Sequence, residues 1–226
     1  MFPIGDTEVR GQTFPFVNYA IIVVNVIVFL FELGMSQSGL QNFYETYGVI
    51  PTEILHGANL ISLFTSMWIH GGWLHIGGNM LFLWVFGDNI EAVMGHIMYL
   101  FFYLIGGIFA GIFHSLLNST STLPSIGASG AIAAVLGAYI IIFPRSRVRL
   151  LYFLGFFVGI TRISALIFIG IWFVEQFFIG VASLGPNTAQ SGGVAVWAHV
   201  GGFLFGLLIG LFLRDRAARL DFGRNT

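Results

Sequence analysis

The chain has 226 residues, of which 57% are hydrophobic and only 8% are charged, and its formal net charge is −1. Soluble domains are about one quarter charged, so this composition excludes a surface that faces water on all sides. The near-neutral charge gives no indication of a nucleic-acid partner. The absence of cysteine excludes disulfides and thiolate metal sites. Composition therefore predicts a single integral membrane domain.

Six apolar segments are candidate membrane spans, each of which needs about 20 residues to cross roughly 30 Å of hydrocarbon. They cover residues 16–33, 70–86, 96–117, 129–143, 162–182 and 194–213. A further apolar stretch, 150–160, is too short to span and is expected at the interface. The first segment could instead be a signal peptide, but Gly34-Met35-Ser36 is a poor cleavage site. We therefore predict an all-α membrane protein of six transmembrane helices.

The basic residues predict the orientation of these spans. Arginine supplies all nine of them, and with six spans every arginine falls on one side, because loops 34–69, 118–128 and 183–193 contain none. By the positive-inside rule both termini are cytoplasmic. The expected organisation is a membrane domain over residues 16–213 between cytoplasmic tails at 1–15 and 214–226. A compact six-span chain of this kind suits a prokaryotic inner membrane.

Four polar residues lie inside the expected spans, where polar groups are costly and are candidates for function. Ser129 and His199 stand 16 and 15 residues before the next arginine, which places both about 23 Å from the inner side at 1.5 Å per residue. His75 and Asn79 are expected in the same outer half. The fourth span is short, so loop 118–128 must enter the membrane, where irregular backbone is tolerated around a water-filled cavity. A hydrolase needs such a cavity, and we expect it to open to the outer side.

Small residues give Ser129 and His199 a way to meet. They recur every four positions, at Ser129, Ala133 and Gly137 in the fourth span and at Gly202, Gly206 and Gly210 in the sixth, a spacing that lets membrane helices approach closely. These faces could serve packing alone. However, Gly127-Ala128-Ser129-Gly130 places the hydroxyl where free N–H groups of a helix N-terminus could form an oxyanion hole. His199 would be the base for Ser129. Glu175 on the fifth span is the nearest carboxylate by depth, but we do not expect it to be a third member, so the sequence predicts a Ser-His dyad.

The sequence lacks the residues that other hydrolytic mechanisms require. There is no His-Glu-x-x-His zinc motif, no lysine for a Ser-Lys dyad, and no pair of aspartates within the spans. A metal held by His70, His75 and Asn79 is not expected, because carboxylate ligands are missing nearby. We expect no cofactor. Outside the expected site, His114 is interpreted as a satisfied polar contact, and Glu91 as a structural residue that bonds backbone groups in the inner turn.

Three motifs in order resemble the rhomboid family of intramembrane serine proteases. They are His70-x4-His75-x3-Asn79, Gly127-Ala128-Ser129-Gly130 and Ala198-His199-x2-Gly201-Gly202, on the second, fourth and sixth spans. The resemblance implies a six-helix bundle with Ser129 as nucleophile and His199 as general base. It also implies that His75 and Asn79, with the Ser129 N–H, stabilise the oxyanion, supported by His70, Gly127, Gly130 and Gly202.

By the same resemblance, substrates would be single-span membrane proteins within the lipid bilayer, cleaved near the outer end of the span. Loop 183–195 would be a mobile cap over the site. Many relatives carry a Trp-Arg pair in the first outer loop, whereas loop 34–69 has no arginine, which leaves its anchoring open. Two other functions are alternatives: an inactive relative that binds membrane clients, and a transporter with His75 and His199 as proton relays. The intact Ser129 and His199 argue against the first, and the lack of an inverted repeat argues against the second.

Overall fold

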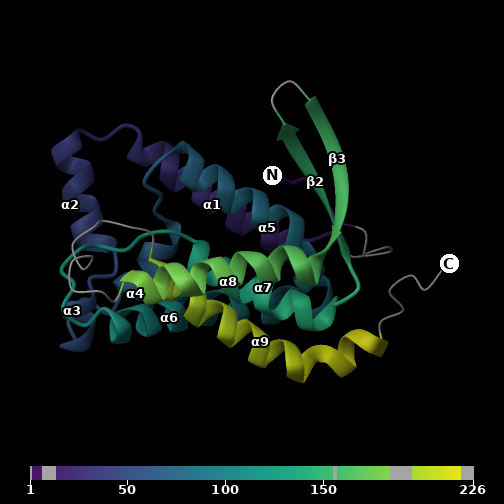
Figure 1. The fold of residues 1–226 in the computed structure, drawn as a ribbon. Helices are drawn as coiled ribbons and strands as arrows, with labels where there is room; N and C mark the ends of the chain where they lie inside the picture. Colours follow the sequence, from purple (N-terminus) through teal and green to yellow (C-terminus); the bar gives the residue numbers. More distant parts are fainter. Residues whose placement is uncertain (1, 7–13, 155–156, 184–194, 220–226) are drawn as a thin grey trace.

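A computed structural model describes residues 2–6, 14–154, 157–183 and 195–219 and is mostly helical (Figure 1). The helices are α1 (Phe16–Glu32), α2 (Gln37–Tyr47), α3 (Pro51–Leu55), α4 (Ser62–Thr65), the 3-10 turn η1 (Ser66–Trp68), α5 (Trp73–Met94), α6 (His96–Leu117), α7 (Ser129–Ile142), α8 (Ala165–Ser183) and α9 (Val196–Arg219). The strands are β1 (Phe2–Pro3), β2 (Arg147–Leu154) and β3 (Phe157–Ser164).

Three helices in the described part of the chain are long and apolar enough to cross a membrane: α6, α8 and the Val196–Arg214 part of α9. Helices α1 and α7 are apolar but shorter. Large apolar side chains cover the outside of the bundle; Leu74 is 93% exposed and Phe212 is 76% exposed. Burying such surface in hydrocarbon is favourable, whereas exposing it to water is not. The fold is therefore that of a membrane protein.

The helix bounds agree with the apolar segments except where polar residues continue a helix. Helices α1, α6 and α7 begin where the sequence predicts. Helix α5 continues beyond the expected end at residue 86 to Met94, because Asn89 and Glu91 are buried against the rest of the protein. Helix α9 likewise extends past residue 213 to Arg219, into the segment expected to be a tail.

A three-stranded antiparallel sheet, in the order β1-β2-β3, departs from the expected all-α class. Strand β2 pairs with β3 from Arg147↔Ser164 to Leu154↔Phe157, so the fifth span starts at Ala165 rather than at residue 162. The reason is an alternation in β2, where Val148 is buried but its neighbours Arg147 and Arg149 are exposed. This period of two is the pattern of a strand. Residues 2–3 of the expected N-terminal tail also join the sheet.

Helix α7 is the centre of the bundle, and every residue from Gly130 to Tyr139 is buried. It packs against α9 through the small residues that the sequence singles out. A Cβ on Gly202 would lie 2.0 Å from the Gly130 carbonyl oxygen, and one on Gly206 would lie 1.9 Å from that of Ala134. Since no side chain fits into such a gap, the two backbones are in direct contact, as predicted.

Glu91 joins three helices at the end of the bundle where the strands lie. Its carboxylate accepts hydrogen bonds from the backbone N–H groups of Val17 (2.9 Å) and Asn18 (2.7 Å), and it also contacts Nδ1 of His96 at 2.5 Å. Glu91 thus bonds backbone groups as expected, but those of the first turn of α1. Helix N-termini carry unpaired N–H groups that favour a negative charge, so this contact fixes the start of α1 against α5.

Candidate active site

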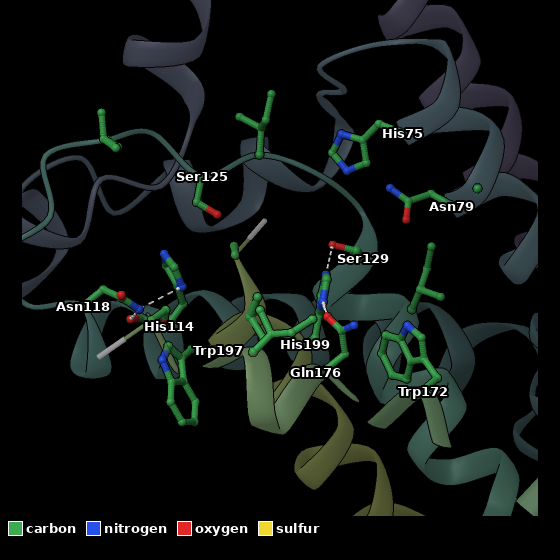
Figure 2. Close-up of a pocket in the computed structure, with 18 of the residues that line it drawn as sticks. His75, Asn79, His114, Asn118, Ser125, Ser129, Trp172, Gln176, Trp197 and His199 are labelled. Atoms are coloured by element: carbon green, nitrogen blue, oxygen red, sulfur yellow. Dashed lines mark hydrogen bonds between the residues drawn. The ribbon is translucent and has the colours of Figure 1, made fainter. Parts of the chain in front are cut away.

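Ser129 and His199 lie in contact at the N-terminal ends of two facing helices. Ser129 is the first residue of α7 and His199 lies in the first turn of α9. The Ser129 Oγ is 2.7 Å from Nε2 of His199, and the imidazole is 6% exposed (Figure 2). The close backbone packing at Gly130 and Gly202 sets the distance between the two helices immediately beside this pair.

Gly127 allows the loop before Ser129 to turn tightly into the helix. Its φ of +127° is disfavoured for residues with a side chain, and a Cβ would lie 2.7 Å from Nε2 of His75. Its N–H donates to the Ser66 carbonyl oxygen at 2.9 Å. Because of both conformation and space, only glycine fits at this position, and its absence of a side chain lets His75 approach Ser129.

His75 and Asn79 come from one face of α5 and point toward Ser129 (Figure 2). The Gly71 N–H donates to Nδ1 of His75 at 3.3 Å, so in the neutral ring the proton is on Nε2. The amide Nδ2 of Asn79 is buried and has no hydrogen-bond partner among the residues that the structure describes. An unpaired buried donor costs about 1–3 kcal/mol, and in a native protein it calls for an explanation. These two donors face the serine.

Backbone donors complete the surroundings of Ser129. Helix α7 begins at this residue without any side-chain cap, and the first N–H groups of an α-helix have no acceptor within the helix. They also carry the positive end of the helix dipole. The position next to the Ser129 hydroxyl is therefore favourable for negative charge.

Helix α8 supplies two contacts to His199 that the sequence did not reveal. Nδ1 of His199 is 2.7 Å from Oε1 of Gln176, and the ring of Trp172 is centred 5.7 Å from the imidazole. Trp172 and Gln176 are four residues apart and share one helix face. Glu175, the nearest carboxylate by depth, is exposed, because one residue turns an α-helix by about 100°. A search for amides at this depth, and not only for carboxylates, would have found Gln176.

A cavity of about 870 Å³ extends from these residues. It is lined by α5, α6, α7, α8, α9 and the loop before α7, and the polar side chains around it are His75, Asn79, His114, Asn118, Ser121, Ser125, Ser129, Gln176, Ser183 and His199. His114 contacts Asn118 through Nδ1 at 3.3 Å, in keeping with its interpretation as a polar contact. No cluster of three or more His, Asp or Glu side chains that could hold a metal occurs within the described ranges.

His70 lies behind the site rather than in it. Its ring is completely buried, does not line the cavity, and packs edge-on against His75 with centroids 5.0 Å apart. The backbone N–H of His70 donates to both carboxylate oxygens of Glu32, at 3.1 and 3.3 Å. Tyr44 of α2 is also hydrogen-bonded to the Glu32 side chain. The pKa of its phenol is raised by burial, by the Glu32 carboxylate and by this hydrogen bond, so Tyr44 stays a neutral donor. Loop 34–69 is anchored here without an arginine.

Comparison with known proteins decides the family. The rhomboid domain model matches residues 57–216, which is most of the chain. The chain belongs to the rhomboid family. Among similar rhomboids, the mitochondrial Rhomboid protein 1 of Saccharomyces cerevisiae is 28% identical over 86% of this chain and 52% of its own length. RHOMBOID-like protein 7 of Arabidopsis thaliana is 28% identical over 80% and 50%. Rhomboid protease GluP of Bacillus subtilis is 27% identical over 87% and 35%.

These comparisons set limits on what carries over from other rhomboids. The chain spans about half or less of the length of the curated relatives it matches. They come from a bacterium, from yeast mitochondria and from a plant, so the similarity identifies an integral membrane protein and not a particular cellular membrane. The prokaryotic inner membrane therefore stays a prediction. The expected cap loop at 183–195 lies, apart from its ends, outside the described residues.

Proposed function

We propose that this rhomboid is an intramembrane serine endopeptidase with Ser129 as nucleophile and His199 as general base. The observation that carries the proposal is the 2.7 Å contact between Oγ and Nε2, at the wall of a cavity that also exposes unpaired donors. A serine hydroxyl is a weak nucleophile until a base within hydrogen-bond reach removes its proton. Nε2 of His199 lies within that reach of the Ser129 hydroxyl, which supports its proposed role as base.

In the first half of the reaction, Nε2 of His199 takes the Ser129 hydroxyl proton while Oγ attacks the scissile carbonyl carbon. The carbonyl oxygen becomes an oxyanion. Nδ2 of Asn79, Nε2–H of His75 and the Ser129 N–H would donate to it, and such preorganised donors act most strongly where water is excluded. The imidazolium then gives its proton to the leaving amine as the peptide C–N bond breaks, which leaves an acyl-serine.

In the second half, water attacks the acyl carbon and His199 takes one of its protons. The Ser129 oxygen leaves and regains a proton from the imidazolium. Water is thus a substrate, and a cavity with polar walls is the route by which it can reach a site between membrane helices. No cofactor and no metal enters these steps.

The membrane arrangement is part of the proposal. Six helices, α1 and α5 to α9, would span the bilayer with the N- and C-termini on the cytoplasmic side and Ser129 in the outer half. Substrates would be single-span membrane proteins whose helix unwinds near its outer end, because an extended segment is needed for the carbonyl to reach Oγ. The volume of the cavity, about 870 Å³, is sufficient for several side chains of such a segment.

The test is cleavage in proteoliposomes that contain purified protein and a panel of single-span substrates. We expect cleavage that falls by about 10⁴-fold or more in Ser129→Ala and in His199→Ala. Labelling of Ser129 by a fluorophosphonate should be lost in the same variants.

Two results would count against this function. Cleavage that continues unchanged in Ser129→Ala would exclude Ser129 as the nucleophile. A wild-type protein that neither cleaves any substrate nor reacts with the fluorophosphonate, yet binds the substrates, would instead identify an inactive member that binds clients.

A further inference from the structure

We propose that Gln176 is a positioning residue for the general base, and that the site is in effect a triad of Ser129, His199 and Gln176. The inference rests on the proposed function and deepens it. The Gln176 side-chain oxygen accepts a hydrogen bond from Nδ1 of His199, and thereby directs the Nε2 lone pair at the serine. Gln176 does not touch the reacting atoms and acts only through the imidazole.

The positions of the protons follow from the two contacts of the ring. A glutamine Oε1 can only accept, so at 2.7 Å the Nδ1 of His199 must carry the proton and donate it. A neutral imidazole has one N–H, so Nε2 is then unprotonated and can accept from the Ser129 hydroxyl at 2.7 Å. In a histidine, the hydrogen bond at one ring nitrogen sets the state of the other. Gln176 therefore selects the tautomer that a base requires.

The neighbours of His199 leave this role to Gln176. Of the other titratable side chains that face the cavity, His75 comes from α5 and His114 from α6, and neither is hydrogen-bonded to His199. Trp172 packs against the imidazole, and the next residue, Phe173, stacks on Phe203 of α9 with ring centroids 4.2 Å apart. These aromatic contacts hold α8 against α9 and keep Gln176 at Nδ1.

A neutral acceptor also suits this location. A carboxylate would stabilise the imidazolium more strongly, but an ionised carboxylate buried in a low-dielectric site carries a large desolvation cost. It would also place a second negative charge near the developing oxyanion. An amide orients the ring and accepts its proton without that charge, which explains how the site can function although Glu175 points away.

The experiment compares Gln176→Met, which keeps the length of the side chain but removes the acceptor, with Gln176→Glu, which retains one. Glu175→Gln is the control, because the same helix carries this exposed side chain away from His199. For Gln176→Met we expect kcat and the rate of fluorophosphonate labelling to fall about 10- to 100-fold, with KM changed by less than about twofold. Gln176→Glu should recover most of kcat and move the acid limb of its pH profile upward, because a carboxylate favours the imidazolium.

A second readout needs no substrate. In protein labelled with ¹⁵N-histidine, the His199 signals, assigned by their loss in His199→Ala, should report the Nδ1–H tautomer in the wild type and a mixture in Gln176→Met. An unchanged tautomer, an unchanged kcat in Gln176→Met, or a Gln176→Glu variant as impaired as Gln176→Met with an unmoved acid limb would each overturn the proposal. Failure of the protease proposal appears separately, as cleavage that survives Ser129→Ala.

Discussion

Two buried asparagines of α5 differ in whether their side-chain amides are hydrogen-bonded within the protein. Asn89, near the end of α5, satisfies its amide by donating to Asp6 at 2.7 Å and to the Val85 carbonyl oxygen at 3.4 Å. Asn79, nearer the start of α5, lines the cavity, and its amide Nδ2 has no partner in the described part of the chain. The first side chain contributes its hydrogen bonds to folding. The second keeps a donor for the proposed oxyanion.

Substituting these two asparagines should therefore have opposite effects. Asn79→Ala should lower kcat by about 10²- to 10³-fold, the typical loss for one oxyanion donor, and leave Tm unchanged or slightly higher because an unpaired buried donor is removed. Asn89→Ala should lower Tm, since it leaves Asp6 without this donor, while kcat of the folded enzyme is kept. Kinetics and thermal unfolding of both variants in detergent micelles measure this. A fall in Tm for Asn79→Ala without loss of kcat would contradict the assignment.

At the scale of elements, the distance between Ser129 and His199 depends on the contact between α7 and α9. Glycines at 202 and 206 place one helix backbone against the other, and the space that a methyl group would need is already occupied by backbone oxygens. Backbone cannot move aside as a flexible side chain can. The distance between Ser129 and His199 is thus set by glycines, which have no reactive side chain.

A matched pair of glycine substitutions tests this dependence. Gly206→Ala would place its methyl 1.9 Å from the Ala134 carbonyl oxygen, so it should destabilise by about 1–3 kcal/mol and reduce kcat by separating the helices. Gly170→Ala in α8 meets no atom within 4 Å and should be neutral, or stabilise by up to about 1 kcal/mol. Thermal unfolding and kcat measure both effects. Equal Tm values for the two variants would disprove the close contact.

How much the sequence could predict differs between elements for physical reasons. Long apolar runs give the bounds of α1, α6 and α7, and the glycine spacing predicts that α7 and α9 pack together. The hairpin of β2 and β3 was not predicted because its strands are almost as apolar as a membrane span. Hydropathy therefore does not reveal their period of two. The contact of Gln176 with His199 was not predicted, because counting residues gives the depth of a side chain in the membrane but not the side of the helix on which it lies. The catalytic roles of Ser129, His199, His75 and Asn79 stay predictions, which kinetic experiments test.

At the scale of the whole molecule, the two ends of the bundle differ in character. The hairpin with Arg147, Arg149 and Arg162 lies at one end, and α2 and α3 of the arginine-free outer loop lie at the opposite end (Figure 1). Arginines flanking spans remain on the cytoplasmic side during insertion. The separation of charge seen along the sequence is therefore also a separation in space.

This polarity predicts which residues an impermeant reagent can reach. The protein has no cysteine, so single substitutions can be labelled without background. In intact cells, Ser38→Cys in α2 should react with a membrane-impermeant maleimide. Thr161→Cys in β3 should react only after the membrane is permeabilised; both side chains are exposed. Labelling of Thr161→Cys in intact cells would reverse the proposed orientation.

The carboxylate of Glu91 has a consequence for the order in which the protein is completed during synthesis. It holds the first N–H groups of α1, from which it is separated by 73 and 74 residues of chain. Because a chain emerges from its N-terminal side, α1 is made well before the side chain that pairs with its exposed amides. Those amides must remain in water or among lipid head groups until the end of α5 arrives. Ribosomes stalled before residue 91 should therefore yield an α1 that is inserted but not yet held at its N-terminus by α5.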